Sequence, residues 1–108
     1  MAEFANWQWV DLEETSSTND EVKRLCAAAP SGKRFMVAAR RQNAGRGRRG
    51  RGWVSLEGNL SVSFGLEVAP QLLGQMTFVV GLSVLEAVRE LAPQADVCLK
   101  WPNDVLVG

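Results

Sequence analysis

The chain has 108 residues, of which 12 are basic and 12 acidic, and it contains no histidine. This length suits one small domain, and 46% hydrophobic with 22% charged residues is the composition of an ordinary globular protein. Without histidine, serine–histidine and cysteine–histidine catalysis are excluded.

Cys26 and Cys98 do not have the spacing of metal ligands, and we expect both to be buried free thiols. No uninterrupted apolar run approaches the ~20 residues that span a bilayer. The first residues lack a basic region followed by an apolar stretch, so there is no sign of a secretory signal. We therefore expect a cytoplasmic protein without a membrane partner.

The first part of the chain predicts a strand, a helix and a second strand. Residues 8–13 alternate as a strand does. Thr18 and Glu21 fit a capping box at the start of a helix. Apolar residues at helical spacing then mark one face of that helix, at Val22, Leu25, Cys26 and Ala29. Residues 30–32 end the helix, and residues 34–39 form a short apolar strand.

A basic segment follows. Between Arg40 and Arg51 the chain holds six arginines and no acid, which indicates a local anion site more than a nucleic-acid-coating surface. Residues 43–52 contain four glycines and no apolar residue larger than alanine. Such a segment buries too little apolar surface to offset its ordering entropy, so we expect a mobile loop in the absence of ligand.

The second half of the chain predicts one long helix between two pairs of short strands. The helix covers residues 71–91, and Gly81 inside it indicates a close backbone contact. Strands are expected at residues 53–55, 59–68, 96–100 and 105–107. This order predicts an α+β fold, with a mixed β-sheet and helices on one face, more than a doubly wound parallel sheet.

The string Gly45-x-Gly47-x-x-Gly50 matches a dinucleotide-binding fingerprint only literally. That fingerprint needs a helix directly after the glycines, and here a strand-like segment follows at Trp53. The arginines of this segment instead offer guanidinium forks for a carboxylate or a phosphate. Such positive charge suits a reaction in which a carboxylate attacks a phosphate, because the two anions repel each other. A solvated basic loop remains the alternative.

Two further segments carry polar side chains, one at an expected turn between strands and one at an expected helix N-terminus. In residues 100–104, Asn103 can donate and accept hydrogen bonds, and Asp104 can hold a hydroxyl or Mg²⁺. An Asx-type turn between two strands is the alternative, which these residues alone favour. In residues 16–19, hydroxyls at a helix N-terminus either cap the helix or also clasp an uncharged polar head group such as a urea.

Together, three segments resemble the signature segments of biotin–protein ligases, in the same order. They are Ser17-Thr18-Asn19, the arginine–glycine segment 42–53, and Lys100-Trp101-Pro102-Asn103-Asp104. The resemblance implies a fold akin to class II aminoacyl-tRNA synthetase and biotin–lipoate ligase catalytic domains. It also implies that biotin and ATP form biotinyl-5′-adenylate, from which a lysine of a biotin carboxyl carrier domain takes the biotinyl group.

The resemblance further implies roles for matching residues. Biotin would be held by Ser17, Thr18, Asn19, Gln42, Gly45, Arg46, Gly47 and Arg48. The nucleotide would be held by Arg48, Arg51, Trp53, Lys100, Asn103 and Asp104. Arg48 and Arg51 would be catalytic, with Arg48 clamping the biotin carboxylate to the α-phosphate. Asp104 is the residue for a possible Mg²⁺.

We expect residues 1–108 to be the N-terminal part of such a catalytic domain, without a winged-helix domain or the C-terminal β domain. The isolated chain would then fold poorly or be inactive, exposing a sheet edge and apolar surface. A lipoate–protein ligase, an inactive remnant and an Arg-Gly RNA-binding module remain alternatives. The RNA module would have aromatics between its arginines, and residues 40–51 have none. A monomer and a homodimer both remain open, and DNA is not an expected partner.

Overall fold

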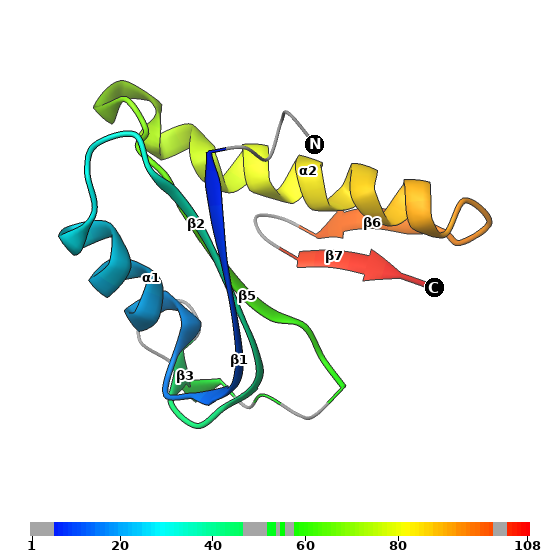
Figure 1. Cartoon of the computed structure of the whole chain (residues 1–108). Coiled ribbons are helices and arrows are strands. Elements are labelled where there is room, and N and C mark those ends of the chain that lie inside the picture. Colours follow the sequence, from blue (N-terminus) through cyan, green and yellow to red (C-terminus); the bar gives the residue numbers. More distant parts are fainter. Residues whose placement is uncertain (1–5, 47–51, 54, 56–57, 101–103) are drawn as a thin grey trace. The chain divides into compact units, whose positions relative to one another are not determined.

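The computed structural model describes residues 6–46, 52–53, 55, 58–100 and 104–108. The chain divides into two compact units, residues 1–67 and residues 68–108. Figure 1 shows the elements of both units, and each unit is described by itself below.

The first unit is built on a three-stranded mixed sheet. Its strands are β1 (Trp7–Thr15), β2 (Arg34–Gln42) and β5 (Ser61–Gly65), in the order β1-β2-β5. β1 runs parallel to β2, whereas β5 is antiparallel to β2. The expected mixed sheet is confirmed, and β1 and β2 are longer than the sequence pattern predicted.

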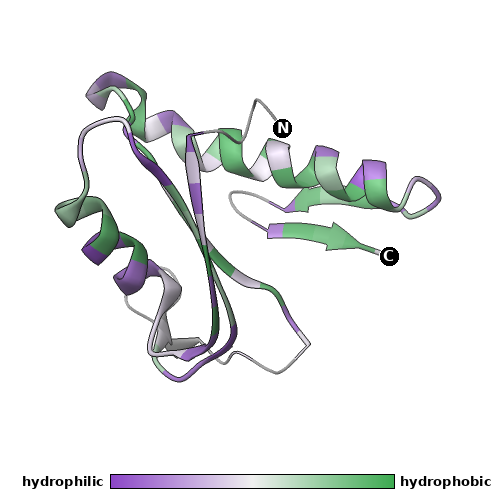
Figure 2. Cartoon of the chain, in the orientation of Figure 1, coloured by the Kyte–Doolittle hydropathy of each residue, from purple (hydrophilic) through white to green (hydrophobic). Residues whose placement is uncertain are grey.

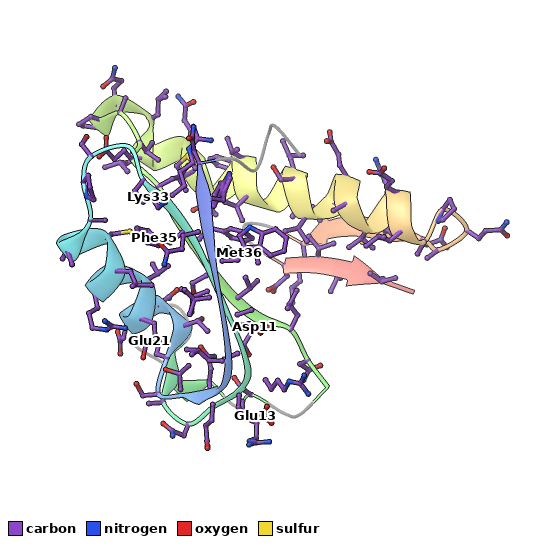
Figure 3. The ribbon with its side chains drawn as sticks, in the orientation of Figure 1. Asp11, Glu13, Glu21, Lys33, Phe35 and Met36 are labelled. Carbon is purple, nitrogen blue, oxygen red and sulfur yellow. The ribbon has the colours of Figure 1, made fainter. Side chains whose placement is uncertain are left out.

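Helix α1 (Thr18–Ala28) covers one face of this sheet (Figure 1). The core between them contains Val22, Phe35 and Val37, and the side chain of Val37 is fully buried. Alternation along β2 decides which residues reach this core, because neighbouring side chains point to opposite faces. Figure 3 shows Phe35 on the side of α1 and Met36 on the opposite side.

The face of β5 that carries small residues packs against α1, and the face that carries bulky residues points away from it. Ser63 and Gly65 are buried, whereas Leu60 and Phe64 are 81% and 55% exposed. A Cβ on Gly65 would lie 2.5 Å from Sγ of Cys26, so glycine permits α1 to approach the sheet closely. On the other face, Phe64 packs edge to face on the ring of Trp7, at 5.9 Å between ring centroids.

The expectation of buried thiols is wrong. Cys26 and Cys98 are both exposed free cysteines. Helical spacing placed Cys26 on the apolar face of α1, but the buried residues of this helix are Thr18 and Val22 alone.

The arginine–glycine segment begins and ends in paired strands. β3 (Gly45–Arg46) is antiparallel to β4 (Gly52–Trp53), with Arg46 opposite Gly52. A loop was expected over residues 43–52, but residues 45–46 and 52 lie in paired strands, and residues 47–51 lie outside the described part of the chain. A dinucleotide-binding fingerprint needs a helix after its glycines, but Gly52 and Trp53 form a strand. The structure thus agrees that Gly45-x-Gly47-x-x-Gly50 is not such a fingerprint.

The second unit combines a long helical stretch with a β-hairpin. A 3₁₀ helix, η3 (Pro70–Gln75), leads directly into α2 (Met76–Leu91), which packs on β6 (Val97–Lys100) and β7 (Asp104–Val107). The predicted helix 71–91 is therefore confirmed. Its first residues form a 3₁₀ helix, which is wound more tightly than an α-helix. Gly81 is the buried residue of α2, and it lines a surface concavity together with Val105 of β7. The close backbone contact expected at Gly81 remains a prediction.

The helical stretch Pro70–Leu91 meets the length and composition of a bilayer span, with a mean hydropathy of 1.4 over 18 residues. Figure 2 shows its apolar character along most of α2. Charged residues such as Glu86 and Arg89 interrupt this stretch, so it does not stand out in the sequence as an uninterrupted apolar run. Core helices have the same composition, so length and hydropathy alone do not place α2 in a membrane.

Candidate functional site

The candidate site begins at the N-terminus of α1, where Ser17 is the N-cap. Ser17 has an extended backbone, and its Oγ accepts a hydrogen bond from the N–H of Asp20 at 3.4 Å. The capping box predicted from Thr18 and Glu21 is therefore wrong, because the N-cap is Ser17, one residue earlier. Glu21 instead accepts from Oγ1 of Thr15 at 3.1 Å.

Glu21 also pairs with Arg24 at 2.7 Å. The hydrogen bond from Arg24, followed by that from Thr15, lowers the pKa of the Glu21 carboxyl below its usual value. Glu21 thus anchors the first turn of α1, and Figure 3 shows its place on this helix. The side chain of Thr18 is left available for other partners.

Thr18 binds Gln42, which ends β2. The backbone N–H and Oγ1 of Thr18 lie 2.7 and 2.9 Å from the same Oε1 of Gln42. A backbone N–H only donates, so the carbonyl end of the Gln42 amide must face Thr18. The amide nitrogen of Gln42 then donates to Oγ of Ser55 at 3.0 Å. The orientation of Gln42 is thereby determined at both ends.

Ser63 of β5 completes this group. Its Oγ lies 2.7 Å from Oγ1 of Thr18, and it donates to Oδ1 of Asn19. Ser63 is 8% exposed and Thr18 is 3% exposed, so both hydroxyls are buried. We call Thr18, Asn19, Gln42, Ser55 and Ser63 the hydroxyl–amide cluster. Sequence reasoning missed Ser63, although the small, polar face of its strand was a signal.

Backbone hydrogen bonds attach the arginine–glycine segment to the same place. The N–H of Asn43 donates to the carbonyl of Thr15 at 3.1 Å, and that of Ala44 donates to the carbonyl of Ser16 at 2.8 Å. These bonds extend the parallel pairing of β1 and β2 beyond the partners Thr15 and Gln42. The first and second signature segments therefore meet at one edge of the sheet.

The structure brings several predicted site residues together and leaves others undescribed. Those that meet at the N-terminus of α1 are Ser17, Thr18, Asn19 and Gln42, whereas Gly45 pairs with Trp53 in the β3–β4 ladder. The β3–β4 pairing adds the backbones of Arg46 and Trp53. The predicted residues outside the described part of the chain are Gly47, Arg48, Arg51 and Asn103.

The third signature segment belongs to the second unit. Lys100 and Asp104 are exposed strand partners across the β6–β7 hairpin. Residues 101–103, for which an Asx-type turn was the alternative, lie outside the described residues. Within the residues that the structure describes, no cluster of three acids or cysteines is suited to a metal ion. Asp104, the residue expected to bind Mg²⁺, is an exposed carboxylate that belongs to no such cluster among the described residues.

The hydroxyl–amide cluster contains neutral donors and acceptors only. Thr18 and Asn19 place it at the positive end of the α1 dipole, and its member Gln42 comes directly before the glycine-rich residues 43–52. Neutral polar groups in a buried place suit an uncharged ligand group with its own donors and acceptors, since each unpaired polar group would cost free energy.

Comparison with known proteins agrees with this geometry. The family model described as "Biotin/lipoate A/B protein ligase family" matches residues 12–108. The chain belongs to the biotin/lipoate A/B protein ligase family. Among curated relatives, a biotin–(acetyl-CoA-carboxylase) ligase of Mycobacterium tuberculosis is 36% identical over 94% of this chain. The corresponding ligase of Paracoccus denitrificans is 42% identical over 90% of it.

Solved structures of the biotin/lipoate ligase family confirm the α+β fold. A Leishmania major biotin protein ligase in complex with biotinyl-5-AMP matches 93% of this chain and 47% of its own, with a TM-score of 0.80 and 33% identity. An Aquifex aeolicus biotin protein ligase in complex with biotin and ATP matches 94% of this chain and 41% of its own, with a TM-score of 0.66 and 38% identity. The chain spans 41% of each of the two curated relatives.

Proposed function

We propose that this chain carries the biotin-binding and adenylating part of a biotin–protein ligase. The observation that carries the proposal is the junction of the first two signature segments, where the hydroxyl–amide cluster, with Thr18 and Ser63 buried, adjoins the start of the arginine–glycine segment. The similar proteins of M. tuberculosis and P. denitrificans are named as biotin ligases, which supports biotin as the substrate.

The proposed reaction has two steps. A biotin carboxylate oxygen attacks the α-phosphorus of ATP, which forms biotinyl-5′-adenylate and releases pyrophosphate. The neutral amine of a carrier-domain lysine then attacks the acyl carbonyl, which forms an amide, releases AMP and loses a proton. Neither step needs a protein nucleophile, in accordance with the absence of histidine. Positioning of the reactants and stabilisation of negative charge account for the catalysis.

The residue roles follow the two segments. Ser17, Thr18, Asn19 and Gln42 hold the ureido ring, and Gly45, Arg46 and Gly47 lie along the acid chain. Arg48 clamps the carboxylate to the α-phosphate, and Arg51 steers the phosphates. This order follows the chain, because Gly45 and Arg46 come directly after the backbone bonds to the start of α1.

The nucleotide is held by Trp53 against the adenine and by Lys100, Asn103 and Asp104 near the phosphates. Mg²⁺ bound to ATP needs only one or two protein carboxylates in addition to phosphate oxygens. Asp104 is exposed and suits one such contact. The carrier domain of an acetyl-CoA or pyruvate carboxylase is the proposed protein partner.

Lipoate is the second candidate substrate, because the family contains lipoate ligases. The hydroxyl–amide cluster favours biotin over lipoate. A ureido ring offers hydrogen-bond donors and an acceptor to these hydroxyls and amides, whereas a dithiolane offers none.

Calorimetric titration of the purified chain tests this function. We expect saturable biotin binding and a further heat on addition of ATP and Mg²⁺. Arg48→Ala should abolish the second heat. Arg40→Ala is the matched control, because Arg40 is an exposed partner of Glu13 at 3.5 Å and lies before the second signature segment. Absence of heat with both ligands would contradict adenylation by this chain.

A further inference from the structure

The turn between α1 and β2 has one backbone N–H that its own hydrogen bond does not use. The N–H of Lys33 donates to the carbonyl of Pro30 at 3.3 Å and closes the turn. Gly32 inside it has a φ of 86°, in the left-handed region that glycine adopts without strain. The N–H of Gly32 instead donates to Oε1 of Glu67 at 2.9 Å. The turn thus binds a partner from a distant part of the chain.

Glu67 receives a second hydrogen bond from the same turn. Oγ of Ser31 donates to the same oxygen, Oε1, at 2.8 Å, although the two residues are 36 positions apart. The hydrogen bond from Gly32, followed by that from Ser31, lowers the pKa of the Glu67 carboxyl below its usual value. Glu67 therefore stays charged at neutral pH, and a charged acceptor strengthens both hydrogen bonds.

Glu67 lies where the chain leaves the first unit. The division between the units falls between Glu67 and Val68. Residues 66–69, which we call the connection, join β5 to η3 and form neither helix nor strand. A segment of this kind opens more easily than a strand or helix, because fewer backbone hydrogen bonds hold it. The two bonds to Glu67 therefore restrict the connection at the point where it leaves the first unit.

The freedom of the connection matters for a ligand whose binding residues are divided between the units. In the proposed function, residues of the first unit alone hold biotin. The nucleotide, by contrast, is held by Trp53 of the first unit and by Lys100 and Asp104 of the second. Such a ligand must order the connection when it binds, which costs conformational entropy. A connection that the turn already holds loses less entropy on binding.

We propose that Glu67 is a latch that holds the connection on the turn at residues 30–33, and that it is thereby a positioning residue for nucleotide binding. The second half of this inference rests on the proposed function, whereas the latch does not. Opening of the latch should release the connection and weaken ATP binding. Biotin binding should not change, because its proposed residues all belong to the first unit.

Each side of the latch can be changed and its effect measured at the other side, in the full 108-residue chain. Ser31→Ala removes one donor and should raise the rate of elastase cleavage after Val68 about threefold, although the sequence of the connection is unchanged. Glu67→Ala should accelerate hydrogen exchange of the Gly32 amide about fivefold, as measured by NMR. Glu14→Ala, the same change at another exposed position of the first unit, should alter neither rate.

Calorimetric titration measures the positioning role. Glu67→Ala should weaken ATP binding in the presence of biotin about fivefold, which corresponds to ordering one further backbone residue. Its affinity for biotin should equal that of the unsubstituted chain. Glu67→Gln retains an oxygen that can accept from both donors, so its ATP affinity should lie between those of Glu67→Ala and the unsubstituted chain.

The outcomes separate the latch from the proposed function. Unchanged cleavage in Ser31→Ala, or unchanged Gly32 exchange in Glu67→Ala, overturns the latch whether or not the chain binds biotin. Normal ATP binding by Glu67→Ala overturns the positioning role. So does an equal loss of biotin and ATP affinity, because general destabilisation predicts that result. Absence of binding by the unsubstituted chain overturns the proposed function and the positioning role together, and the two rates then still decide on the latch.

Discussion

Thr18 donates two hydrogen bonds to one oxygen of Gln42, from its backbone N–H at 2.7 Å and from its Oγ1 at 2.9 Å. Twenty-four residues separate the two in the chain. The contact joins the first residue of α1 to the last residue of β2, and it gives the helix N-terminus and the arginine–glycine segment a common anchor.

Replacement of Gln42 by alanine should therefore affect folding and binding together. The change leaves the backbone N–H of Thr18 without its acceptor, which costs ~1–3 kcal/mol of unfolding free energy. Urea unfolding of Gln42→Ala measures this loss, and biotin titration should show weaker binding. Gln8→Ala, at an exposed position of β1, is the control. Equal stability of the two variants would contradict the anchoring role of Gln42.

The N-cap assignment makes a separate prediction. Ser17→Ala removes the oxygen that accepts from the N–H of Asp20, and it should lower the unfolding free energy by ~1 kcal/mol. Ser17→Asp should retain most of that stability, because aspartate is also a good N-cap. Ser16→Ala is the matched neighbour, since Ser16 is exposed and its backbone carbonyl, which accepts from the N–H of Ala44, is unchanged by the substitution. A larger loss from Ser16→Ala would contradict the assignment.

Gly65 permits the close approach of α1 to β5, so its replacement should be unfavourable. In Gly65→Ala the new methyl would lie 2.5 Å from Sγ of Cys26, and repacking should cost ~1 kcal/mol. The double variant with Cys26→Ala removes the clashing atom and should recover most of the loss. Thermal unfolding of both variants measures this coupling, and equal midpoints for the single and double variants would exclude the clash as the cause. Gly74→Ala is the control, because its Cβ would have no neighbour within 4 Å.

The pKa of Glu21 can be measured by NMR titration of its side-chain carboxyl. It should lie below 4.5, and Arg24→Ala should raise it more than Thr15→Ala does. A folded-state pKa below the unfolded value means that the contribution of Glu21 to stability is present above pH 4.5. The contribution is lost as the pH falls through the folded-state pKa. An unshifted carboxyl would show that Arg24 and Thr15 do not bind Glu21 in solution.

Local patterns in the sequence were sufficient for most elements of the fold. The apolar spacing around Val22 and Leu25 predicted α1, and residues 30–32 marked its end, because helix periodicity and turn chemistry depend on neighbours a few residues apart. The same holds for α2 and for the β6–β7 pair. Local pattern did not distinguish Ser17 from Thr18 as the N-cap, because both are good capping residues and long-range partners decide between them.

What the sequence determined by itself was the order of strands and helices, apart from the short strand β3, and the family resemblance of residues 17–19, 42–53 and 100–104. The tertiary structure decided that Ser63 joins Thr18 and Asn19, that Gln42 faces Thr18 with its carbonyl, and which side of β5 lies beneath α1. Each of these depends on the pairing and register of β1, β2 and β5. Strand register brings together residues more than twenty positions apart, and no local periodicity contains that information.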